Sequence, residues 1–231
     1  MSLPLTKVPE YDLKLSNDVT VRYRPFLVRE EKILLMAIET RDDNEITKAF
    51  VNIVQSCVVS NTDVTKIPFY DFEWLWLNIR AKSVGESVDL KLKCPDDEQV
   101  VVDYTLKIDD IKPNLNKQVE TKIEFEPGYG VIMKLPTISE VGNKKSISEL
   151  TYSLVKDCIQ SVYNGDEIFD RTDIEVSELE EFVNNLTMSQ FKKISKFFEE
   201  LPQIEHTIKY KNPKSGKEFE FEIKGAADFF Q

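Results

Sequence analysis

The position in this chain that looks most like a metal-binding knuckle is a cysteine followed by a proline. Cys94 and Pro95 end an alternating segment and precede the acidic run Asp96, Asp97 and Glu98. A structural zinc site uses about four ligands, commonly cysteines in closely spaced pairs. Only one cysteine stands here, and the acidic run lacks the spaced oxygen ligands and the glycine of a calcium loop. We therefore expect a solvated acidic turn, with no bound metal and no other cofactor.

Acid–base and nucleophilic chemistry have few candidates. His206 is the only histidine, so any triad that depends on histidine would have to use it. It begins a predicted strand, no nucleophile motif lies nearby, and we interpret it as structural. A pair such as Asp170 and Asp173 leaves open a carboxylate-based, metal-dependent hydrolase, but among 41 acidic residues such pairs arise by chance. We expect no enzymatic activity and no catalytic residue, with that hydrolase as the alternative from another class.

Composition narrows the classes of partner. The net charge of −11 disfavours nucleic acid, because neutralising phosphates requires clustered lysine and arginine. Gly128-Tyr129-Gly130 is interpreted as a turn, and no glycine-rich loop opens a helix to hold a nucleotide. No apolar run approaches the roughly 18 residues of a membrane span, so we expect no membrane partner. The widely spaced Cys57, Cys94 and Cys158 favour a reducing compartment.

The elements around the Cys94 knuckle occur twice. Residues 90–95 read Leu-Lys-Leu-Lys-Cys-Pro and residues 208–213 read Ile-Lys-Tyr-Lys-Asn-Pro. Each copy continues through a polar turn into a second alternating strand, at residues 100–106 and 218–223. Strict alternation of apolar and polar residues is typical of a half-buried antiparallel strand. We predict two related strand–knuckle–strand hairpins shaped like a degenerate zinc ribbon.

The N-terminal part combines strands and helices. Alternation predicts strands at residues 11–15 and 19–24, and strong helix formers predict a helix over 28–39. A second helix begins at a cap among residues 42–44 and carries its apolar stripe as far as Cys57.

Both tryptophans lie in the next predicted helix, which begins near Asp71. Trp74 and Trp76 belong to a segment that is apolar around most of the helix circumference. Such a helix is buried on several sides or offers a surface to a partner, and both interpretations remain open.

The C-terminal part is predicted to be largely helical after a β-insert of two strands at 119–125 and 131–135. A capping box at Ser146 and Glu149 introduces an apolar stripe that runs to Val162. Two further capping boxes predict helices, and they are Ser177 with Glu180 and Thr187 with Gln190. Phe229 and Phe230 lie next to the C-terminal Gln231, and they either fold back onto the core or anchor a partner.

The fold class that these elements predict is α+β, with antiparallel β-hairpins and two groups of helices. The weakest joint is the polar stretch 112–118. We therefore predict an N-terminal subdomain over residues 1–112 and a C-terminal subdomain over 119–231, or one compact domain that contains both.

Four segments together resemble the baseplate hub protein family of T-even-type contractile-tailed bacteriophages. They are Tyr23-Arg-Pro-Phe-Leu-Val-Arg-Glu-Glu-Lys, residues 69–86 with both tryptophans, the hairpin at 88–104, and Gly225-Ala-Ala-Asp-Phe-Phe. Hairpins in some members of that family look like cysteine-bearing zinc knuckles. This chain departs from the pattern, because Cys94 is the only cysteine in its two predicted hairpins.

The resemblance implies a non-enzymatic role in assembling the central hub of the tail baseplate. The expected partners are other phage baseplate or hub proteins, met in the host cytoplasm, with no small-molecule substrate. An assembly chaperone is the first expectation, and a permanent structural subunit of the virion tail baseplate is the alternative. The residues that we expect to contact a partner are Trp74, Trp76, Phe229 and Phe230.

Overall fold

The structure is a computed structural model, and it describes residues 7–111, 117–141 and 147–225. The chain divides into two compact units. The first unit is built from residues 1–64, 70–116 and 202–231, and the second from 65–69 and 117–201. After the short segment 65–69, the chain enters the second unit again at residue 117, within the polar stretch 112–118. The C-terminal hairpin, which our sequence-based division places with the C-terminal subdomain, is grouped with the first unit.

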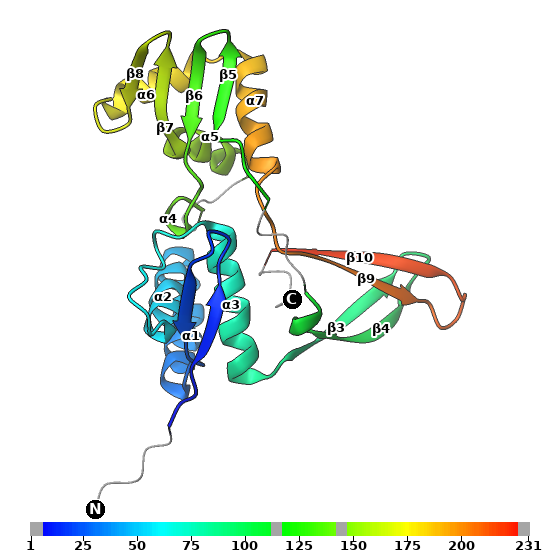
Figure 1. Cartoon of the computed structure of the whole chain (residues 1–231). Helices are drawn as coiled ribbons and strands as arrows, with labels where there is room; N and C mark the ends of the chain where they lie inside the picture. Colours follow the sequence, from blue (N-terminus) through cyan, green and yellow to red (C-terminus); the bar gives the residue numbers. More distant parts are fainter. Residues whose placement is uncertain (1–6, 112–116, 142–146, 226–231) are drawn as a thin grey trace, which may run out of the picture. The chain divides into compact units, whose positions relative to one another are not determined.

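In its described residues, the first unit contains three two-stranded antiparallel sheets, β1–β2, β3–β4 and β9–β10, together with three helices (Figure 1). Its elements are β1 (Tyr11–Lys14), β2 (Thr20–Tyr23), α1 (Val28–Thr40), α2 (Asp43–Cys57), α3 (Phe69–Val84), β3 (Ser87–Cys94), β4 (Asp97–Lys107), a 3-10 turn (Ile108–Asp110), β9 (Glu205–Lys211) and β10 (Glu218–Lys224). The predicted N-terminal strands, helical hairpin and tryptophan helix are all present.

Helix α3 forms the centre of the helical part of this unit. Leu75 and Ile79 are fully buried, and Trp76 is 6% exposed. The rings of Phe50 from α2 and Trp76 meet edge to face, with centroids 4.5 Å apart. The side chain of Asp42 caps α2 by accepting the backbone N–H groups of residues 44 and 45, as the sequence predicts. Apolar packing therefore fixes α3 against α2.

The two related hairpins are confirmed as antiparallel pairs. Along β3, exposed and buried residues alternate without interruption, and the buried set ends at Cys94. Ile208 and Tyr210 are the buried residues of β9. The zinc-ribbon-like detail is not confirmed, because polar side chains meet where the two knuckles lie, as described below.

The second unit is a four-stranded antiparallel sheet of order β5-β6-β7-β8, with helices on one face (Figure 1). Its elements are β5 (Lys122–Glu126), β6 (Tyr129–Met133), α4 (Ile138–Val141), α5 (Ile147–Cys158), β7 (Ile159–Asn164), β8 (Glu167–Asp170), α6 (Val176–Asn184) and α7 (Met188–Glu199). Its core joins Val131 and Met133 of β6 to Val155 of α5, Leu179 of α6 and Ile194 of α7. The mixed α+β fold class is thus confirmed.

The predicted helical stripe that runs to Val162 is wrong. Helix α5 ends at Cys158, and residues 159–170 form the β7–β8 hairpin. The physical reason lies in the sequence: Ile159, Val162 and Tyr163 favour strands, and Asn164-Gly165 is a tight hairpin turn in which Gly165 has φ of +61°. Because Cys158 and Val162 continue the helical spacing of Leu154, the predicted stripe extends almost as far as this turn.

Of the capping boxes predicted for α6 and α7, one is confirmed and one is wrong. Thr187 and Gln190 form the predicted capping box at α7. The predicted box of Ser177 and Glu180 is wrong, since α6 begins one residue before Ser177 with the N-cap Glu175, whose box partner is Glu178. Ser146 lies outside the described residues, so the box proposed there remains a prediction.

The glycines of the predicted turn at 128–130 serve two purposes. Gly128 adopts φ of +79° in the tight connection between β5 and β6. Gly130 lies within β6, where a Cβ atom would come 2.1 Å from the carbonyl oxygen of Ile123. The close approach of neighbouring groups therefore requires a glycine at position 130.

Candidate interaction surfaces

The residues that we predicted to contact a partner lie in different surroundings. Trp76 is buried, and its ring stacks on Phe26 at a centroid distance of 5.9 Å. Trp74, on the same helix, is half-buried and retains exposed surface. Phe229 and Phe230 lie outside the described residues. Of the two tryptophans, Trp74 alone offers appreciable surface to a partner in this conformation.

The residues considered as candidates for catalysis or metal binding lie on different elements. His206 is half-buried in β9, Asp170 ends β8, and the backbone N–H of Asp173 donates to the carbonyl of Asp170 in a turn. Within the described ranges, no three histidine, cysteine or acidic side chains lie together as ligands for a metal ion. The described part of the chain also has no helix long and apolar enough to cross a bilayer.

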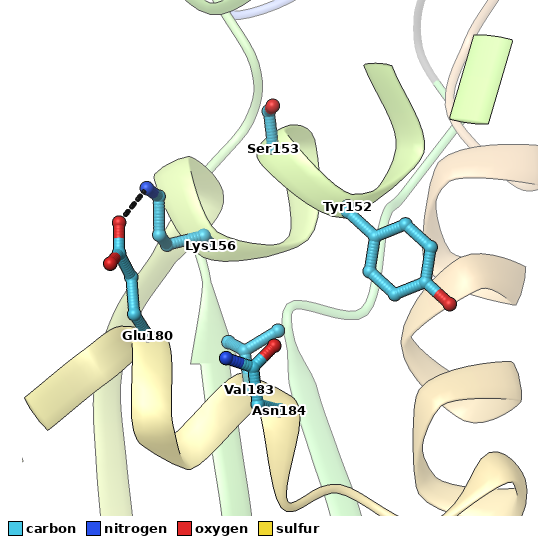
Figure 2. A pocket seen from close by; sticks show the side chains of 6 residues that line it. All are labelled: Tyr152, Ser153, Lys156, Glu180, Val183 and Asn184. Carbon is cyan, nitrogen blue, oxygen red and sulfur yellow. Dashed lines mark hydrogen bonds and ion pairs between the residues drawn. The ribbon is translucent and has the colours of Figure 1, made fainter. Parts of the chain in front are cut away.

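A shallow cavity lies between α5 and α6, and Figure 2 shows the residues that line it. Its volume is about 220 Å³, below the roughly 300–1,000 Å³ typical of small-molecule sites. Lys156 and Glu180, its charged residues, bind each other at 2.7 Å. Tyr152 stands at its rim and packs on Phe191, with centroids 4.8 Å apart. These features indicate a surface groove and supply no reactive group aimed at a ligand.

The tips of the two related hairpins are joined by polar side chains. The Asp96 carboxylate accepts hydrogen bonds from Asn212 Nδ2 at 2.8 Å and from Ser215 Oγ at 2.7 Å. The same interactions lower the pKa of Asp96: the hydrogen bond from Ser215 contributes most, followed by that from Asn212. The Tyr210 hydroxyl donates to the Lys93 carbonyl at 2.7 Å. A hydrogen-bonded carboxylate therefore joins the knuckles, beside the buried Cys94 thiol.

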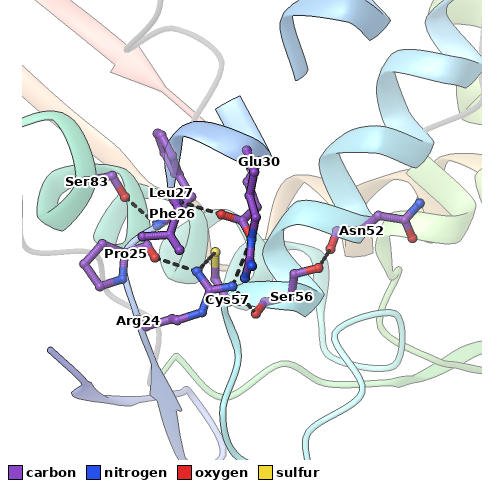
Figure 3. Close-up of polar contacts among 10 residues, drawn as sticks. Arg24, Pro25, Phe26, Leu27, Glu30, Asn52, Ser56, Cys57 and Ser83 are labelled. Carbon is purple, nitrogen blue, oxygen red and sulfur yellow. Dashed lines mark hydrogen bonds and ion pairs between the residues drawn. The ribbon is translucent and has the colours of Figure 1, made fainter. Parts of the chain in front are cut away.

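A polar cluster fixes the N-terminal end of α1 (Figure 3). Glu30 is the buried residue of this helix, at 4% exposure. Its Oε1 atom accepts from Arg24 and Arg29, at 3.0 and 2.8 Å, and its Oε2 accepts the backbone N–H of Leu27 at 2.7 Å. Arg24 also donates to the carbonyl of Ser56 at 3.0 Å, which ties α1 to the end of α2.

The ionisable groups of this cluster have shifted pKa values. Burial acts to raise the pKa of Glu30, but the hydrogen bonds from Arg29, Leu27 and Arg24 outweigh it, and the net shift is downward. Burial raises the pKa of the nearby Cys57 thiol to about 11. Because the thiolate is the reactive form, Cys57 is a poor nucleophile and serves as a packed, apolar residue.

The outward surface of α1 is apolar to an unusual degree. Five of its aliphatic side chains are exposed: Val28 at 81%, Ile33 at 51%, Leu35 at 56%, Met36 at 58% and Ile38 at 49%. We call these five residues the outer face of α1. Exposed apolar side chains that gather in one patch mark interaction surfaces more often than the same residues scattered singly.

A smaller exposed apolar site occurs on the sheet of the second unit. Ile168 and Phe169 of the edge strand β8 are 63% and 47% exposed. The opposite edge strand, β5, is covered differently: Lys193 of α7 donates to the carbonyl oxygens of Glu124 and Phe125, at 2.9 and 3.0 Å. Covering an edge in this way blocks further strand pairing, so β8 is the more accessible edge.

Our reading of the sequence did not identify the outer face of α1, although a signal was present. Residues 33–38 read Ile-Leu-Leu-Met-Ala-Ile, six consecutive apolar residues inside a helix. Consecutive residues of a helix point around its whole circumference, so a run of this length is all buried only if the helix is surrounded. Helix α1 is followed by a single helical neighbour in its hairpin, α2, and part of the run is therefore left in solvent.

A family model described as "T4 bacteriophage base plate protein" matches residues 8–231. Because the match covers nearly the entire chain, the protein belongs to this family of phage baseplate proteins. The resemblance inferred from the four segments is thus confirmed at the level of the baseplate family. No curated protein and no solved structure matches the chain.

Proposed function

We propose that this protein acts in assembling the central hub of the tail baseplate by binding other baseplate or hub proteins, as an assembly chaperone. The observation that carries the proposal is the family match over residues 8–231. A role in binding is supported by the exposed apolar side chains of α1 and β8. Arg24 binds Glu30 near the start of α1, and β8 pairs with β7. Association takes place in the host cytoplasm, before the tail is complete.

The contact residues remain those expected from the sequence. Trp74 contributes the exposed part of α3, and Phe229 and Phe230 contribute a terminal aromatic pair. Trp76 is buried against Phe26 and Phe50, and it contributes by holding α3 in place. Aromatic side chains carry a large share of the binding energy of protein interfaces, which favours them as anchors.

The alternative is a permanent structural subunit of the baseplate hub. A quantitative mass-spectrometric inventory of purified virions separates the two roles. We expect the protein in infected cells but not at stoichiometric level in mature particles. Stoichiometric presence in the virion would replace the chaperone role with that of a subunit.

The contact residues are tested in infected cells by complementation. Trp74→Ala, and separately deletion of residues 226–231, should reduce the yield of assembled baseplates while the purified variants keep the wild-type unfolding midpoint. The matched control is Tyr104→Ala, which removes another half-buried aromatic side chain, on β4. Normal assembly with both changes combined would reject these contact residues.

A further inference from the structure

We propose that the outer face of α1 binds the same face of a second copy of this chain, as an antiparallel pair of helices related by two-fold symmetry. This inference goes beyond the proposed function, because it concerns how the protein associates with itself. It rests on the exposed aliphatic residues of α1 and on the order of two charges among them.

The centre line of the outer face follows the helix axis. Val28, Lys32, Leu35 and Glu39 succeed one another at spacings of four, three and four residues, so they lie along one line of the helix surface. All four side chains are exposed. The opposite line carries Glu30, which is buried in the polar cluster. The first line therefore faces away from the unit that α1 belongs to.

The two charges on this line are placed symmetrically about its apolar centre. Lys32 and Glu39 are seven residues apart, about 10.5 Å along the axis at 1.5 Å per residue, and Leu35 and Met36 lie midway between them. In an antiparallel pair centred there, each Lys32 faces the Glu39 of the other copy, and the aliphatic side chains meet between the two ion pairs. A parallel pair would place Lys32 against Lys32 and Glu39 against Glu39.

Within the part of the chain that the structure describes, both charges are available for an ion pair with another molecule. Among the described residues, no ion pair involves Lys32 or Glu39, whereas Lys48 of the adjacent helix α2 binds Glu45 at 3.0 Å. An isologous interface requires a surface that is complementary to itself, and opposite charges at equal distances from an apolar centre meet that requirement. A helix of 13 residues is small for an interface, so we expect a dimer that dissociates on dilution.

The test measures oligomeric state by sedimentation velocity over a range of concentrations up to about 100 μM, where an interface of this size is expected to associate. The wild-type chain should shift from 26.8 kDa toward twice that mass as concentration rises. Leu35→Asp and Met36→Asp should remain monomeric throughout. The matched control is Met188→Asp, because Met188 is 75% exposed at the start of α7 in the second unit, and this variant should dimerise like the wild type.

Charge reversal tests the antiparallel geometry. Lys32→Glu alone and Glu39→Lys alone should each raise the dissociation constant about tenfold, because each places like charges opposite one another. The double variant Lys32→Glu with Glu39→Lys should restore wild-type dimerisation, because it exchanges the two partners of the same ion pair. Since all of these side chains are exposed, the unfolding midpoint should change little in each variant.

Each remaining outcome counts against the proposal. A monomeric wild type at the highest concentration, or equal loss of dimer in Met188→Asp and Met36→Asp, would overturn it. If the double variant dimerises no better than the single ones, the antiparallel pairing is wrong. A monomeric protein that still supports baseplate assembly would remove this inference and leave the proposed function standing.

Discussion

Helices α1 and α3 have similarly apolar sequences within one unit, and they use that apolar surface in opposite ways. In α3, eight of 16 residues are buried, among them Phe72 and Leu77 with no exposed surface. In α1, the buried residue is the acidic Glu30, and most of the large aliphatic side chains are exposed. The difference shows that an apolar helix can be held by polar contacts at one end while its apolar surface stays available.

The neighbours of each helix explain the difference. Helix α3 meets Phe50 of α2, Phe26 of the β2–α1 connection and Ser16 of the β1–β2 turn, so it has contacts on several sides. Helix α1 is anchored by Arg24 and by α2. The number of elements packed around a helix therefore decides the burial of its apolar side chains more than the sequence of the helix does.

The largest effect should be the difference in stability loss when one apolar side chain is truncated in α3 and one in α1. Trp76→Ala should lower the free energy of unfolding by about 3–5 kcal/mol, because it removes a packed aromatic ring and leaves a cavity. Leu35→Ala on the outer face of α1 should change it by less than about 0.5 kcal/mol in dilute, monomeric protein. Urea unfolding followed by tryptophan fluorescence and circular dichroism measures both. Similar losses of unfolding free energy in the two variants would show that α1 is buried in solution, and they would contradict the difference between α1 and α3.

The next effect concerns the anchor of α1. Glu30→Ala removes the acceptor shared by Arg24, Arg29 and the Leu27 amide, so it should cost about 1.5–3 kcal/mol, a range typical of hydrogen bonds to charged groups. Glu45→Ala is the matched control, because Glu45 forms an exposed pair with Lys48 that contributes little. Equal losses in the two variants would show that α1 does not depend on its polar cluster.

The smallest effect should be seen in the pH dependence, where the buried acids of the two helices act in opposite directions. The lowered pKa of Glu30 adds stability that is present above its unfolded pKa of about 4.3 and is lost as pH falls through its lower folded value. Burial raises the pKa of Asp71 in α3, and hydrogen bonds from Ser16 only partly oppose this. The ionisation of Asp71 therefore costs stability as pH rises from its unfolded pKa of about 3.9 through its raised folded value.

Substitution separates the two contributions. Glu30→Gln should flatten the loss of stability on acidification, and Asp71→Asn should remove the loss on raising pH through the folded pKa of Asp71. Urea midpoints recorded from acidic to neutral pH give both slopes. If the two variants change the slope in the same direction, the assignment of opposite shifts is wrong.

Local signals in the sequence predicted much of this fold. The repeated Lys91 and Lys209 patterns predicted both hairpins, and Asp42 and Thr187 predicted the starts of two helices. Such features depend on residues close together in the chain. The end of α5 was missed because apolar spacing alone does not separate a helix that continues to Val162 from a strand that begins at Ile159.

The interaction surfaces were harder to predict for a different reason. Trp74 and Trp76 are two residues apart in the sequence, yet one is half-buried and the other buried, because Phe26 and Phe50 pack on Trp76. The exposure of Leu35 likewise depends on which elements surround α1. Tertiary neighbours decide both cases, and no periodicity within one helix contains that information.

The contact between the hairpin tips has a consequence for the order of events during synthesis. Asp96 and Asn212, which bind each other, are 116 positions apart, and the entire stretch 117–201 is translated between them. That stretch holds nearly all of the second unit and can collapse as soon as it leaves the ribosome, since its strands pair with near neighbours. In the first unit, the contact between the hairpin tips cannot form until the second hairpin, β9–β10, has been synthesised. In a nascent chain, the second unit can therefore fold before the first unit is complete. A chain released before β9 and β10 are made contains a folded second unit and an incomplete first unit.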